Sequence, residues 1–222
     1  KIGDIVGLKV SEEREQIARH HSATHLLHAA LRAVLGAHIA QAGSLVEADR
    51  LRFDFSHPKA LSDEELAKIE EFVNNAVCKD CAAKTEIMDI DDAKNSGAIA
   101  LFGEKYGSKV RVVSFGEISK ELCGGIHVRN LSEIGSFFIV KESGVSAGVR
   151  RIEAVCSRAA LNLALQNRAK LAEISAELKG IEPLRAIEKL KDEIRSLKDQ
   201  IKHASSSHAL AFLNVGDTKL CV

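Results

Sequence analysis

Four side chains in this sequence have the types and spacing of a metal site. His21 and His25 are four residues apart, so on a helix both imidazoles lie on one face and can reach a single cation. Further along the chain, Cys123 and His127 enclose two glycines, whose turn can direct both side chains inward. Three imidazole nitrogens and one thiolate sulfur make a complete ligand set of the kind that suits zinc.

The composition of this ligand set favours a catalytic or ligand-binding metal over a structural one, because structural zinc sites rely mainly on thiolates. Metalloprotease helices carry glutamate directly after the first histidine, and here that position is Ser22, which argues against peptide hydrolysis by that route. The polar groups of Thr24, Gln41 and Asp54 could orient a small polar part of a substrate. A plain ion pair between Arg52 and Asp54 is an equally good interpretation of that strand.

The overall composition is that of a globular protein. Hydrophobic residues make up 45% and charged residues 28% of the 222 residues, which argues against disordered and low-complexity classes. No apolar run approaches 18 residues, so we expect neither a transmembrane helix nor a membrane partner. Lys+Arg and Asp+Glu balance at 31 each, so a nucleic-acid site must be a local patch. Five scattered cysteines favour a reducing compartment, and we expect a cytoplasmic protein.

The apolar patterns predict an α+β fold, with a mixed or antiparallel sheet packed by helices. Helical spacing covers residues 12–35, 62–77 and the short segment 91–96. Strand patterns cover residues 1–10, 51–55, 85–90, 109–115, 136–140 and 149–155. Helices and strands alternate irregularly, which argues against a doubly wound parallel sheet.

Three segments of different character divide the chain. Residues 1–157 form the predicted α+β domain, and residues 158–204 are rich in Leu, Ala, Lys and Glu with a seven-residue isoleucine spacing. This second segment predicts a helical hairpin or a coiled-coil arm, which either folds back or supports a dimer. We expect residues 205–222 to begin a further, truncated domain. Because the chain starts at Lys1, we also expect a fragment or a processed product that lacks the N-terminal part of the first domain.

Six sequence blocks occur in a fixed order within the first domain. They are HHSATHLLHAALR (20–32), QAGSLV (41–46), LRFDFSH (51–57), GAIALFGEKY (97–106), ELCGG (121–125) and GVRRIEA (148–154). Together they resemble the editing domain of alanyl-tRNA synthetases. The related editing domain of threonyl-tRNA synthetases shares the metal pattern, but it fits the intervening blocks less well.

This resemblance implies roles for individual residues. It places the Zn²⁺ ligands at His21, His25, Cys123 and His127. Gln41 matches the glutamine of the editing pocket, and the Thr24 hydroxyl faces the misacylated amino acid. Arg150 and Arg151 match a basic pair that helps to hold the tRNA acceptor end. One position departs from the pattern, because Ile126 stands where the family usually has threonine, and a missing hydroxyl there would affect activity or selectivity.

The implied chemistry has a physical rationale. An alanine pocket cannot strongly reject glycine or serine, because such small differences change binding by only about 1–3 kcal/mol, so a second, hydrolytic site is needed. Zinc could hold the amino group of the mischarged residue, or it could lower the pKa of a water toward about 7 for attack on the ester. Backbone N–H groups around Gly124 and Gly125 could stabilise the developing oxyanion.

We therefore expect an editing hydrolase that clears Ser-tRNA(Ala) and Gly-tRNA(Ala) as part of an alanyl-tRNA synthetase. Nothing in the sequence resembles an ATP-binding core, so this segment is not expected to activate alanine. Two alternatives stay open: a free-standing trans-editing deacylase, and a non-catalytic tRNA-binding module with structural zinc. Of the other histidines, we expect His28 outside the ligand set, and His20, His38 and His57 at the surface or at helix caps.

Overall fold

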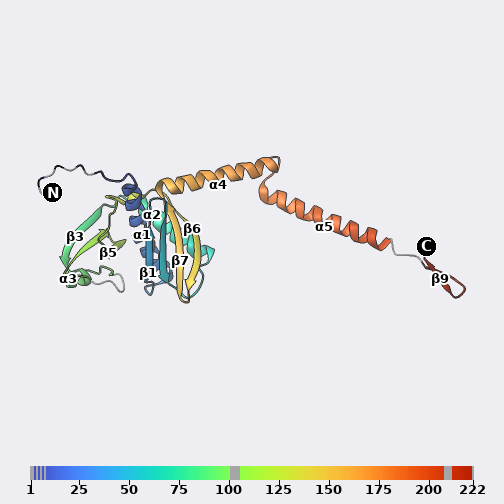
Figure 1. Cartoon of the computed structure of the whole chain (residues 1–222), viewed down its shortest axis with the longest axis horizontal. Helices are drawn as coiled ribbons and strands as arrows, with labels where there is room; N and C mark the ends of the chain where they lie inside the picture. Colours follow the sequence, from blue (N-terminus) through green and yellow to red (C-terminus); the bar gives the residue numbers. More distant parts are fainter. Residues whose placement is uncertain are drawn as a thin grey trace. The chain divides into compact units, whose positions relative to one another are not determined.

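A computed structural model of the chain describes residues 9–100, 106–207 and 212–221, together with residues 3, 5 and 7 (Figure 1). Two compact units are present, Lys1–Ala164 and Leu165–Val222, and each is described by itself. Within the described ranges, no helix is both long enough and apolar enough to cross a membrane.

A four-stranded antiparallel sheet forms one layer of the first unit. Its strands are β1 (Gln41–Val46), β2 (Leu51–Ser56), β6 (Phe137–Ser146) and β7 (Val149–Cys156), in the order β1-β2-β7-β6. Phe53 of β2 lies opposite Ile152 of β7, and both side chains are fully buried. The face that carries these residues packs against the helices α1 (Glu13–Leu35) and α2 (Asp63–Val77).

Local sequence signals mark the start of α2 and the end of α1. At the start of α2, Ser62 Oγ accepts the backbone N–H of Glu65, and the Glu65 carboxylate accepts the N–H of Ser62, which makes a capping box. At the end of α1, Gly36 has a φ of +119°, and its N–H donates to the carbonyl of Arg32. Helix α1 is buried over most of its length between His20 and Leu31.

A second antiparallel sheet has the strand order β3-β4-β5, built from β3 (Ala83–Asp89), β4 (Lys109–Phe115) and β5 (Ser119–Leu122). Strand β4 has two buried faces: Val113 and Phe115 join the main core, whereas Val110 and Val112 pack near α3 (Ile90–Asn95). Figure 1 shows α1 between the two sheets. The chain that leaves β5 therefore runs along α1 before the short helix η1 (Leu131–Ile134).

The predicted α+β class is confirmed, and every strand pairing between the described strands is antiparallel. The helices expected at 12–35 and 62–77 and the strand at 109–115 agree with the structure to within a residue. Strands β1 and β5 were not predicted: β1 (QAGSLV) lacks an alternating apolar pattern and has an irregular register near Gly43. Of the strand expected at residues 1–10, half of the residues lie outside the described part of the chain, and the described residues 3, 5, 7, 9 and 10 are not in a strand.

The described part of the second unit consists of helical segments and a β-hairpin. Helix α4 (Ser157–Glu177) crosses the boundary between the units, and α5 (Pro183–Ser207) lies within the second. A hairpin follows, formed by β8 (Phe212–Val215) and β9 (Thr218–Cys221). The heptad residues of α5 are about half-exposed, for example Leu190 at 50% and Ile194 at 51%. The role of this apolar stripe of α5, in a helical hairpin or in a dimer interface, stays a prediction.

Candidate metal centre

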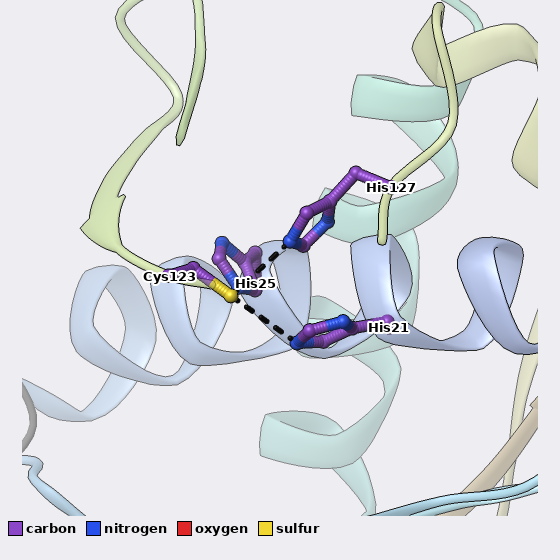
Figure 2. A group of neighbouring side chains, drawn as sticks. All are labelled: His21, His25, Cys123 and His127. Carbon is purple, nitrogen blue, oxygen red and sulfur yellow. Dashed lines mark hydrogen bonds between the residues drawn. The ribbon is translucent and has the colours of Figure 1, made fainter. Parts of the chain in front are cut away.

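The structure brings the four predicted ligand residues together (Figure 2). His21 and His25 project from neighbouring turns of α1, and Cys123 and His127 come from the turn after β5. One potential ligand atom from each residue lies within 4.8 Å of all the others. The Cys123 sulfur is 3.5 Å from Nε2 of His21 and 3.3 Å from Nε2 of His127.

These spacings suit a tetrahedral zinc ion. Zinc bonds of 2.0–2.1 Å to nitrogen and about 2.3 Å to sulfur put neighbouring ligand atoms about 3.4–3.6 Å apart. The two sulfur–nitrogen distances of 3.5 Å and 3.3 Å lie close to that range. The widest separation between the ligand atoms is no more than 4.8 Å. The donor types and the spacing therefore both fit zinc.

The imidazoles of the cluster are held in their neutral, metal-binding form. Burial, together with the nearby charge of His25, lowers the pKa of His21 to about 4. Burial, His25 and His21 lower the pKa of His127 to about 2. Burial also lowers the pKa of His25. Near neutral pH the three rings are therefore uncharged and can donate a lone pair to a cation.

Hydrogen bonds orient two of these rings. Nδ1 of His21 lies 3.1 Å from the carbonyl of Ile126, which only accepts, so Nδ1 carries the proton and Nε2 presents its lone pair toward Cys123. Nδ1 of His127 lies 3.1 Å from Oγ of Ser22, which also accepts the N–H of Val128. Ile126 acts here through its backbone, so this bond does not depend on the threonine that the family usually has.

Arg111 of β4 supports the turn that carries Cys123, and its role was not predicted from the sequence. Its Nη1 donates to the carbonyl of Cys123 at 2.7 Å and to the carbonyl of Gly125 at 2.8 Å. The positive charge of Arg111 also contributes to the low pKa values of the cluster histidines. The only signal in the sequence is an arginine that stands among the valines of a predicted strand, in the run VRVV (110–113).

The polar residues expected around the substrate lie in three different places. Thr24 is on α1 between the two ligand histidines, and its hydroxyl donates to the His20 carbonyl at 2.9 Å. Gln41 begins β1 opposite Phe55, on the sheet face that is turned toward α1. Asp54 lies on the other face, since the ring of its neighbour Phe53 faces α1, with its centroid 5.5 Å from that of His28. The structure thus places Thr24 beside the cluster and the other two on the four-stranded sheet.

The predicted basic pair is engaged by carboxylates. Arg151 holds Asp54 through two bonds of 2.7 and 2.8 Å, and Arg150 holds Glu142 through two bonds of 2.5 and 2.6 Å. Arg52 lies farther from Asp54, at 3.7 Å. Asp54 is therefore an ion-pair partner, with Arg151 as the closer of its two arginines.

A cleft of about 1000 Å³ opens next to the cluster and is partly lined by Gly125, Ile126 and His127. Its lining includes the arginines Arg14, Arg19, Arg111 and Arg129 and the carboxylates Glu12, Glu15 and Glu133. Among the described residues, Arg14 and Arg129 have no hydrogen-bonded or ionic partner for their side chains. This cleft borders His127 and carries the free guanidinium groups of Arg14 and Arg129.

The expectation for two other histidines was wrong. His20 and His57, expected at the surface or at caps, are buried, at 0% and 6% exposure. Nδ1 of His20 donates to the Gln16 carbonyl at 3.0 Å, and Nε2 accepts the N–H of Cys156 at 3.2 Å. His20 is buried because both sides of α1 are covered, which helical periodicity alone does not reveal. His57 follows β2, and its ring packs 5.8 Å from the ring of His38 and 6.3 Å from that of Phe55. His28 lies outside the ligand set, as expected.

A comparison with known protein families matches one part of the chain. Residues 110–153, which include Cys123 and His127, match the family described as "Threonyl and Alanyl tRNA synthetase second additional domain". The particular resemblance is to alanine–tRNA ligase. Over its full length the chain is 56% identical to that enzyme from Campylobacter jejuni subsp. jejuni (strain 81116) and 54% identical to that from Sulfurovum sp..

A third relative extends the same comparison. Alanine–tRNA ligase of Sulfurimonas denitrificans is 59% identical over 93% of the chain. The chain spans about a quarter of the length of these relatives, 26% in the first two and 24% in the third. The predicted resemblance to a segment of alanyl-tRNA synthetase is confirmed.

Proposed function

We propose that the chain is an editing segment that hydrolyses Ser-tRNA(Ala) and Gly-tRNA(Ala) within an alanine–tRNA ligase. The observation that carries this proposal is the convergence of His21, His25, Cys123 and His127 in a domain that matches the second additional domain family. The reaction adds water across the ester bond between the amino acid and the terminal ribose. It releases the free amino acid and restores the tRNA hydroxyl.

The metal we propose is zinc, because three imidazoles and one thiolate form its preferred borderline-soft donor set. When bound, zinc supplies Lewis acidity at the reacting ester or anchors the amino group of the substrate. The protein's own contribution is to fix the ligands. His21 and His127 are oriented through Nδ1, and Arg111 holds the carbonyls of the Cys123–Gly125 turn.

The turn also has backbone groups that suit an ester substrate. Gly124 is exposed beside Cys123, and we propose that the N–H groups of Gly124 and Gly125 face the carbonyl oxygen as negative charge develops. Thr24 lies one turn of α1 from His20 and next to His25, and we propose that its hydroxyl contacts the misacylated amino acid after releasing the His20 carbonyl. For Gln41, and for Asp54 on the opposite face, we propose only an indirect role: they help to shape the four-stranded sheet.

For the tRNA acceptor end, we propose the cleft beside His127 as the docking surface. Arg14 and Arg129 have free guanidinium groups there, whereas Arg150 and Arg151 would first have to give up a bidentate carboxylate. The basic pair at 150 and 151 remains the alternative. Phosphate contacts from the cleft would bring the terminal ribose to the histidine cluster.

The remaining assignments are also proposals. We propose an editing domain over residues 1–157, a helical arm over residues 158–204 and the start of another domain over residues 205–222. The arm would pair with a second copy or fold back through the apolar stripe of α5. The five cysteines are scattered along the sequence, and this supports a cytoplasmic location.

The substitution Cys123→Ala separates catalysis from a structural role for the metal. If the segment is an editing hydrolase, this variant loses deacylation of Ser-tRNA(Ala) while its helical circular dichroism is kept. If the metal only stabilises a tRNA-binding module, the variant unfolds instead. Full deacylation by a folded Cys123→Ala variant would contradict the proposed site.

A further inference from the structure

A buried carboxylate lies behind the metal cluster, on the side of α1 that faces β5. Glu121 is only 4% exposed. Its Oε1 accepts the Nδ1–H of His28 at 3.0 Å and lies 3.5 Å from Oγ of Ser119. Its Oε2 lies 3.7 Å from Nδ1 of the cluster residue His25. The two oxygens of one carboxylate thus face two histidines of the same helix.

The third ligand ring, that of His25, has this carboxylate beside its Nδ1 atom. Nδ1 of His21 faces the Ile126 carbonyl, and Nδ1 of His127 faces a serine hydroxyl. Nδ1 of His25 is buried, and at 3.7 Å it makes no hydrogen bond, so Glu121 is the acceptor available to it. With Nδ1 turned to Glu121, Nε2 is the ring nitrogen left for the cluster.

We propose that Glu121 is a positioning residue for the metal centre. Anchored by His28, its carboxylate holds the proton of His25 on Nδ1 and keeps Nε2 directed at the other three ligand atoms. The negative charge of Glu121 is buried and separated from the site only by the imidazole ring of His25. This charge also favours a bound cation. This inference rests on the proposed metal site, but it does not depend on the identity of the hydrolysed substrate.

The variant Glu121→Gln tests the role with little change in shape. Glutamine has a single acceptor oxygen for two histidines, so one ring must face an NH₂ group, and His25 loses its fixed tautomer. We expect zinc to bind about 10- to 100-fold more weakly, measured on the full chain by competition with a chelator. With Co²⁺ as probe, the visible absorption of the bound ion should change in position or intensity.

Glu142→Gln is the matched control. The Glu142 side chain is 8% exposed, against 6% for that of Glu121, and it is also bonded to a basic partner, Arg150. It lies on β6, an edge strand of the four-stranded sheet, which contributes no residue to the cluster. This variant should lower the melting temperature and leave zinc affinity unchanged, which separates loss of a buried carboxylate from loss of ligand positioning.

A measurement on the unsubstituted protein decides the matter if Glu121→Gln does not fold. Nitrogen-15 NMR of the zinc-loaded chain should show His25 bound through Nε2 with a proton on Nδ1. Coordination through Nδ1, or a folded Glu121→Gln protein with unchanged zinc affinity and cobalt spectrum, would overturn the proposal. If the unsubstituted chain binds no zinc at all, the metal site of the proposed function fails instead.

Discussion

His21 and Gly125 are packed so closely that no side chain fits between them. A Cβ atom built on Gly125 would lie 2.1 Å from Cε1 of His21 and 2.6 Å from Nδ1. This contact lets the turn after β5 approach α1 until the Cys123 sulfur is 3.5 Å from the same ring. The glycine is therefore required by the closeness of two segments that are distant in the sequence.

Gly125→Ala should displace the ring of His21 and weaken zinc binding by about 100-fold, because one ligand loses its position. Zinc content and chelator competition measure the effect. Gly124→Ala is the matched control, since a Cβ there meets no atom within 4 Å, and its zinc affinity should be unchanged. Equal zinc binding by both variants would refute the packing argument.

Arg111→Ala should destabilise the zinc-free protein by about 2 kcal/mol, because two bonds from a charged group to backbone carbonyls are lost. Arg111→Lys retains the charge and one of the bonds, so it should recover part of that loss. Urea unfolding of the three proteins measures the difference. An Arg111→Ala protein as stable as the unsubstituted chain would show that the turn holds its shape without this residue.

Metal should protect one cysteine selectively from alkylation. Cys78 is exposed and should react with or without zinc, whereas Cys123 should react only after zinc is removed. Burial raises the pKa of the Cys156 thiol to about 12, so this residue should stay unmodified until the protein unfolds. Mass spectrometry after iodoacetamide treatment reads out each site. Alkylation of Cys123 at equal rates in both samples would count against its role as a ligand.

Two pairs of arginines can be compared for tRNA binding. The double variant Arg14→Ala/Arg129→Ala should weaken binding and reduce the slope of log affinity against log salt by about 2, one for each phosphate contact. The pair Arg150→Ala/Arg151→Ala should lower stability and leave that slope unchanged, because both side chains are bound to carboxylates. The reverse pattern would indicate that the tRNA acceptor end binds at Arg150 and Arg151 on the four-stranded sheet.

The ligand set could be predicted from the sequence because its information is local. A four-residue spacing on a helix and a turn with two glycines specify where four side chains point. The supporting groups could not be found in this way. Arg111 reaches Cys123 and Gly125 only because β4 runs beside β5, and Glu121 meets His25 only because β5 packs on α1.

Sheet register explains the remaining differences. Asp54 and Arg151 were assigned to substrate and tRNA, yet they are directly opposite each other on adjacent strands and form an ion pair. Only the pairing of β2 with β7, which joins segments about a hundred residues apart, reveals this contact. The fold class was predictable from periodicity, whereas these partners depend on long-range pairing.

Release of serine from Ser-tRNA(Ala), with matched zinc-stripped and zinc-restored protein, tests the central claim most directly. The assay needs a high protein concentration, because the chain spans only about a quarter of the length of its relatives. We predict zinc-dependent release of serine, with Ala-tRNA(Ala) left intact. Absence of release from folded, zinc-loaded protein would contradict the proposed editing activity.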